Sequence, residues 1–95
     1  MNQKASVKQE IEVLYPEDLG AIYVNHAQFV MTATDLNIDI GVLRPDPRGK
    51  NATVRISNRL TMSPQHAKMF LLKMQQVLDG YEKDFGEIPT KTKKK

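Results

Sequence analysis

The side chains best suited to catalysis or metal binding are two histidines and two nearby aspartates. His26 and His66 are the only imidazoles and stand 40 positions apart. With Asp35 or Asp39 as a partner, they could form a general base or half of a metal site. Nothing in the spacing brings them together, because His26 falls within an expected strand and His66 within the first turn of an expected helix. We therefore expect no catalytic residue, no metal ligand set and no cofactor site.

Other signals of catalysis are missing as well. The chain has no Cys, which excludes a disulfide framework, a thiolate nucleophile and a Cys-built zinc site. It contains no G-x-S-x-G, phosphate-binding loop, dinucleotide fingerprint or H-E-x-x-H motif. The sequence thus predicts a protein that is not an enzyme.

Cross-strand ion pairing gives the aspartates a simpler role. Asp35 and Asp39 occupy outward positions of one expected strand, and the expected neighbouring strand carries Arg55 and Arg59 on its outward positions. Exposed pairs of this kind contribute only about 0.2–1 kcal/mol, so they set strand register more than stability.

A basic segment supports an alternative, nucleic-acid-binding function. The candidate phosphate contacts lie in and beside one expected hairpin loop, and they are Arg44, Arg48, Lys50, Arg55 and Arg59. A basic β-ribbon can follow phosphates without reading bases, with strong salt dependence. However, no aromatic side chain is interleaved with these bases for stacking. The net charge of +3 also comes from four lysines after residue 90, since residues 1–90 carry ten bases and eleven acids.

Hydrophobic patterning predicts an α+β fold in the order β-β-β-β-α, an antiparallel sheet of about four strands followed by one long C-terminal helix. Apolar residues alternate over residues 10–15, 36–42 and 53–62, and residues 21–31 are rich in β-branched and aromatic side chains. Residues 44–52 hold two Pro and one Gly and predict a long hairpin loop. Matching apolar positions suggests a register that pairs Val42 with Val54, Ile40 with Ile56, Ile38 with Asn58 and Leu36 with Leu60.

The helix has clear start and stop signals. Ser63 is a suitable N-cap, Pro64 suits the first helical position, and Gly86 and Pro89 predict the end. At about 100° per residue, one face of this helix gathers Ala67, Phe70, Leu71, Met74, Leu78, Tyr81 and Phe85. We expect this face to cover the sheet.

Chain length and the two ends set the domain limits. With 95 residues and 10.8 kDa, we expect one domain over residues 10–88, a disordered tail over 1–9 and a disordered Lys-rich tail over 89–95. No apolar run approaches the roughly 18–20 residues that cross a bilayer, and the N-terminus lacks a secretory apolar core. These features predict a cytoplasmic protein with no membrane contact.

Incomplete burial predicts self-association. One helix can shield only one face of a sheet, and the first long strand is apolar on both faces. The residues expected to remain uncovered, and hence to form an oligomer interface, are Tyr23, Phe29, Met69, Leu72 and Gln76. We expect a homodimer or higher oligomer that acts as an interaction or assembly module, with a further protein partner compatible with this role.

Three short motifs resemble a known family. They are Tyr23-x-Asn25, Ser63-Pro-x-His-Ala67 and Tyr81-Glu-x-x-Phe-Gly86. With the stretches around them they cover about two thirds of the chain, and they resemble a family of small prokaryotic proteins known only as a domain of unknown function. The resemblance implies no activity, cofactor or catalytic residue.

Overall fold

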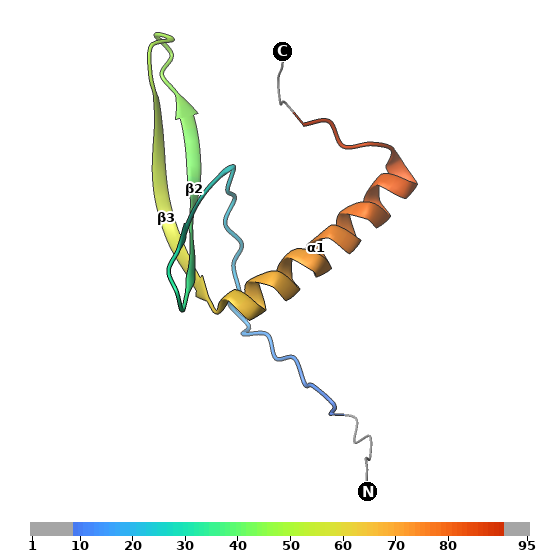
Figure 1. Cartoon of the computed structure of the whole chain (residues 1–95). Coiled ribbons are helices and arrows are strands. Elements are labelled where there is room, and N and C mark those ends of the chain that lie inside the picture. Colours follow the sequence, from blue (N-terminus) through green and yellow to red (C-terminus); the bar gives the residue numbers. More distant parts are fainter. Residues whose placement is uncertain (1–8, 91–95) are drawn as a thin grey trace, which may run out of the picture.

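The protein is a three-stranded antiparallel sheet followed by one helix. The computed structural model describes residues 9–90 and contains β1 (His26–Met31), β2 (Leu36–Pro45), β3 (Ala52–Met62) and α1 (Pro64–Phe85) (Figure 1). The sheet order is β1-β2-β3. The α+β class and the C-terminal helix are therefore confirmed, whereas the prediction of about four strands is wrong.

The missing strand lies in the N-terminal part. Residues 9–25 have no helix or strand, and the predicted strand at 21–31 is shortened to β1. Ile11, Val13 and Tyr15 alternate as predicted, but they are 82%, 66% and 74% exposed. Alternation shows only that a segment can join a sheet, and here no neighbouring strand of the same chain pairs with it.

The side chain of Asn25, just before β1, adds two hydrogen bonds to the backbone of β2. Its Oδ1 accepts a hydrogen bond from the backbone N–H of Leu43 at 2.6 Å, and its Nδ2 donates to the Leu43 carbonyl at 3.3 Å. The amide thereby takes the place of a strand backbone at the end of β1.

The β2–β3 register differs from the predicted one because a bulge interrupts the ladder. Ile38 faces Leu60 and Asp39 faces Arg59, and beyond a shift at Ile40/Gly41 the pairing resumes with Gly41 opposite Ile56. The predicted pairing was thus wrong by two residues before the bulge. Ser57 is the extra residue, and its hydroxyl donates to the Ile40 carbonyl at 3.3 Å.

The strands reach further into the hairpin than predicted. Pro45 pairs with Ala52, which leaves residues 46–51 as the loop in place of residues 44–52. Asp46 organises this loop: its N–H donates to the Asn51 carbonyl, and its carbonyl and carboxylate accept from the N–H groups of Gly49 and Arg48. Gly49 has a φ of 79°, which a glycine adopts without strain.

The predicted helix ends are confirmed. The Ser63 hydroxyl accepts from the His66 N–H at 3.1 Å, and Pro64 occupies the first turn. At the other end, Gly86 has a φ of 97° and its N–H donates to the Glu82 carbonyl. The Glu82 carboxylate then accepts from the Ile88 N–H, which turns the following chain back toward the last helical turn.

The helix does not cover the sheet. It leaves the end of β3 and diverges from the strands, as Figure 1 shows, and none of its residues is buried. Across the described residues, Ile38 is the one buried hydrophobic side chain. The radius of gyration is 18.9 Å, against about 12 Å for a compact domain of this length. The prediction that the apolar helix face packs on its own sheet is therefore wrong.

Two further findings concern the predicted limits of the chain. Within residues 9–90, no helix is long and apolar enough to cross a membrane. The predicted tails fall mostly at residues 1–8 and 91–95, which lie outside the described residues.

Candidate interaction surface

One side of the sheet is an apolar surface. Side chains directly opposite each other in an antiparallel ladder lie on the same side, so the register puts a single row across all three strands through Phe29, Ile38 and Leu60, and a second row through Met31, Leu36 and Met62. We call these six residues the sheet face. Ile38 at its centre is 7% exposed, whereas Phe29 remains 65% exposed.

The helix carries a second apolar surface of similar size. We call Phe70, Met74, Leu78 and Tyr81, with Leu71 and Phe85 beside them, the helix stripe. Two pairs of rings are in contact along this stripe. The ring centroids of His66 and Phe70 are 6.4 Å apart, and those of Tyr81 and Phe85 are 4.9 Å apart. All six stripe residues are exposed.

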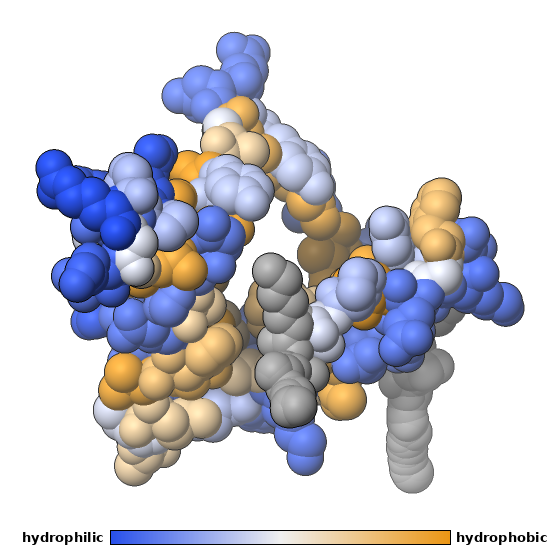
Figure 2. Space-filling view, turned by 90° about the horizontal axis from the view of Figure 1, so that it is seen from above, coloured by the Kyte–Doolittle hydropathy of each residue, from blue (hydrophilic) through white to orange (hydrophobic). Residues whose placement is uncertain are grey.

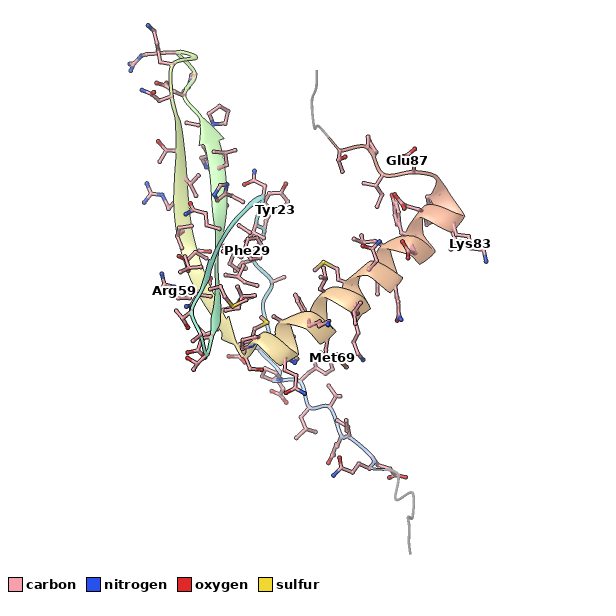
Figure 3. All side chains as sticks on the ribbon, in the orientation of Figure 1. Tyr23, Phe29, Arg59, Met69, Lys83 and Glu87 are labelled. Atoms are coloured by element: carbon pink, nitrogen blue, oxygen red, sulfur yellow. The ribbon has the colours of Figure 1, made fainter. Side chains whose placement is uncertain are left out.

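The two surfaces border an open space. In Figure 3, Tyr23 and Phe29 lie on the side of the sheet toward α1, whereas Arg59 projects from the opposite side. Seen from above, the space-filling surface is open in its middle, and hydrophobic side chains lie on several sides of that opening (Figure 2). Within residues 9–90, most side chains of both apolar surfaces are thus exposed.

Around Asn37 and Asp39, the opposite side of the sheet carries paired polar side chains. Arg59 donates to both Asp39 carboxylate oxygens, at 2.5 and 2.9 Å, and Thr61 donates to Asn37 at 2.7 Å. The hydrogen bond from Arg59, with its positive charge, holds the pKa of Asp39 below the ordinary value and raises that of Arg59. The predicted ion pairing is confirmed for Asp39 with Arg59.

The predicted ion pairs of Asp35 and Arg55 do not form among the described residues. The Asp35 carboxylate accepts from the Thr34 hydroxyl in the turn after β1. Arg55 lies opposite Val42, and the bulge at Ser57 shifts the alternation of β3, so Arg55 and Arg59 lie on opposite sides of the sheet. Their predicted common face is therefore wrong.

The bases proposed for nucleic-acid contact are accordingly divided. Arg48 and Lys50 lie in the hairpin loop, which stands clear of the rest of the chain (Figure 1), and Arg44 lies beside it at the end of β2. Arg59 is engaged by Asp39, and Arg55 faces the other way. Arg44, Arg48 and Lys50 are therefore the candidate contacts that remain near the hairpin loop.

Each histidine has a local neighbour on its own element. His26 Nε2 lies 3.2 Å from the Gln28 side-chain oxygen, and the His66 ring stacks on Phe70. No group of three or more potential metal-binding His, Asp or Glu side chains occurs in the described part of the chain.

The residues predicted for an oligomer interface are all exposed. Tyr23 is 76% exposed, and Met69 and Leu72 are each 52% exposed; Phe29 belongs to the sheet face, and Gln76 is also exposed. Sequence reasoning did not place the helix stripe among these residues because it assigned the stripe to the intramolecular core. The sharp connection between β3 and α1, at Ser63-Pro64, was the available signal against that assignment.

A shallow apolar groove lies at the C-terminal end of α1. Its volume is about 360 Å³, and it is lined by Tyr81 and Phe85 of the helix and by Ile88 and Pro89, which follow the helix end. It continues the helix stripe and does not form a separate enclosed site.

Comparison with known proteins places this fold in an uncharacterised group. Residues 1–90 match the family described as "Protein of unknown function (DUF3467)", and the chain belongs to that family. No curated protein and no solved structure matches the chain. Family membership confirms the resemblance, while the prokaryotic origin stays a prediction.

Proposed function

We propose that this protein is a non-catalytic, homodimeric interaction module whose fold is completed by a second copy of the chain. The observation that carries the proposal is the near absence of a core: Ile38 alone among the described hydrophobic side chains is buried. Folding must offset an ordering cost of roughly 1–2 kcal/mol per residue. One buried side chain cannot do this, so the missing burial has to come from association.

The exposed area supports the same proposal. The chain exposes 8961 Å², whereas a compact monomer of this mass exposes about 5,500 Å². The difference is larger than the roughly 1,000–2,500 Å² that each subunit contributes to an obligate dimer. Association of two copies can therefore remove a large share of this excess.

The N-terminal segment adds a second line of support. Within described residues 9–24, the one backbone–backbone hydrogen bond runs from the Leu19 N–H to the Pro16 carbonyl. The same segment exposes apolar side chains such as Leu14 and Ile22. An extended, apolar segment with free backbone groups suits pairing with a second chain.

The oligomer test uses charge on the helix. We expect light scattering to report a dimer for the unmodified chain, and Met69→Glu combined with Leu72→Glu to give largely unfolded monomers, because folding and association are linked. Lys73→Glu is the matched control, since it changes the charge of the same helix by the same amount without removing an apolar side chain. A stable, folded monomer of the unmodified chain at micromolar concentration would overturn the proposal.

The hairpin tip favours a second candidate function, weak binding of nucleic acid. Arg48 and Lys50 lie in the loop at the protruding end of the hairpin, and Arg44 lies close to it in β2, with one acid, Asp46, among them in the sequence. Such a tip can contact phosphates electrostatically without reading bases.

The test of this candidate is a filter-binding assay at low salt with duplex DNA, single-stranded DNA and RNA. Binding should weaken steeply as salt rises and should be lost in Arg48→Glu/Lys50→Glu. Retention of none of the three nucleic acids would dismiss the candidate without affecting the dimer.

A further inference from the structure

We propose that the two copies exchange their helices: the helix stripe of each chain packs on the sheet face of the other. This inference rests on the proposed dimer and specifies which surfaces meet. Its occupant is a second copy of this chain, related by a two-fold axis.

The join between β3 and α1 keeps the helix away from its own sheet. β3 ends at Met62 and α1 begins at Pro64, so Ser63 is the whole connection. Ser63 has φ −68° and ψ 155°, the extended conformation that a following proline requires, and the ring of Pro64 fixes its own φ.

Two hydrogen bonds fix the start of the helix at this join. The Ser63 hydroxyl accepts from the His66 N–H at 3.1 Å, and the Ser63 carbonyl accepts from the Ala67 N–H at 2.9 Å. Because the helix starts one residue after the strand, no loop is present that would lead α1 back over its own sheet. The space between the sheet and the helix is the place where the proposed second chain packs.

The two surfaces match in length and in chemistry. The 22 residues of α1 span about 33 Å, and the 10 residues of β2 span about 34 Å. The apolar side of β2 runs from Leu36 through Ile38 and Ile40 to Val42, about 20 Å, and beyond it the same side carries Arg55 opposite Val42. The helix is therefore long enough to cover the whole apolar part of the sheet. Next to this part, the other side of the sheet is occupied by the Asp39–Arg59 and Asn37–Thr61 pairs.

Each chain carries one surface of each kind, which favours a second copy over a foreign partner. A two-fold dimer contains two equivalent contacts, each between the helix stripe of one chain and the sheet face of the other, so neither surface is left exposed. An unrelated protein would have to supply both an apolar helix and an apolar sheet. The exchange also leaves Met69, Leu72 and Gln76, on the far side of α1, available for contact near the two-fold axis.

The experiment uses the absence of cysteine from the chain. A tagged chain with Phe29→Cys is unfolded and refolded together with an untagged chain carrying one helix cysteine, introduced at Phe70, Met74 or Leu78. Mild oxidation and a non-reducing gel then report disulfides between the two kinds of chain. The exchange predicts a covalent heterodimer for at least one of the three helix positions.

A matched control places the strand cysteine on the other side of the sheet. Val30→Cys lies next to Phe29 in β1 and, opposite Asn37, belongs to the polar side. It should form no cross-link with any of the three helix positions. Circular dichroism and light scattering on the reduced variants identify those that still fold and dimerise.

A chain carrying both Phe29→Cys and Met74→Cys separates exchange from closure within one chain. Exchange predicts covalent dimers, and closure predicts a covalently looped monomer. If light scattering shows dimers but the sheet–helix disulfides form only within one chain, or do not form at any position, the exchange is overturned and the dimer stands. If the unmodified chain is a monomer, both proposals fail.

Discussion

At the scale of single residues, Asn25 shows how one side chain can extend a sheet. Its amide donates to and accepts from the backbone of Leu43. We expect Asn25→Ala to lower the free energy of unfolding by about 1–3 kcal/mol, because two backbone groups lose their partner. Urea unfolding would measure this loss. Gln28→Ala, which removes an exposed amide from the adjoining strand β1, should change stability by no more than about 0.5 kcal/mol, and an equal effect of both changes would refute the assigned role.

The ion pair between Asp39 and Arg59 predicts a pH dependence. Arg59 lowers the pKa of Asp39 in the folded chain, so the folded state binds that proton less readily than the unfolded state. The stabilisation is present above the ordinary carboxyl pKa and is lost as the pH falls through the lower folded value. Asp39→Asn should therefore reduce the thermal midpoint near neutral pH and have no effect in stronger acid. A difference between the two proteins that does not change with pH would contradict this assignment.

At the scale of elements, the β-bulge depends on Gly41. A methyl group there would overlap the Arg55 carbonyl oxygen and approach the Ile56 Cα to 2.8 Å. Backbone atoms cannot yield as a flexible side chain can, so Gly41→Ala should cost about 1–3 kcal/mol in unfolding free energy. Gly80→Ala is the control, because nothing lies within 4 Å of the added group in the middle of α1. That change should raise stability by about 0.5–1 kcal/mol, and equal signs for the two changes would exclude the proposed crowding.

The elements with strong local signals were predictable from the sequence, and their pairing was not. Ser63 and Pro64 fix the start of α1 through local hydrogen bonding and geometry, so a few neighbouring residues suffice to predict it. The β2–β3 register depends on a bulge at Ser57, which alternation alone does not reveal. Ion pairing between the aspartates of one strand and the arginines of its neighbour was predicted from their opposite charges, and it forms for Asp39 with Arg59 although the apolar matching was two residues out.

The candidate site was predictable only in part for a related reason. Tyr23 and Phe29 were expected to lack cover, and they are exposed. The helix stripe was assigned to an intramolecular core because amphipathic patterning shows that a face is to be buried without showing which chain buries it. Whether the helix stripe can reach its own sheet depends on the direction in which α1 leaves β3. That direction is set at the single-residue connection, Ser63.

At the scale of the whole molecule, the proposed dimer makes the single chain half of a folding unit. Its principal extents are 68 × 36 × 31 Å, and its secondary structure surrounds a space that its own side chains do not fill (Figure 2). Strand pairing and helix capping are satisfied locally, whereas apolar burial is not. In the proposed dimer, contacts between copies supply the missing hydrophobic contribution to stability and the cooperativity of unfolding.

Such coupling predicts that thermal stability depends on concentration. If folding and dimerisation are one step, each tenfold increase in chain concentration favours the folded dimer by about 1.4 kcal/mol. For a dimer of two 95-residue chains, this raises the thermal midpoint by roughly 3 °C. Circular dichroism melts over a hundredfold concentration range would measure the shift. Lys73→Glu should keep the same slope, and a midpoint of the unmodified chain that stays constant over this range would show that the chain folds without its partner.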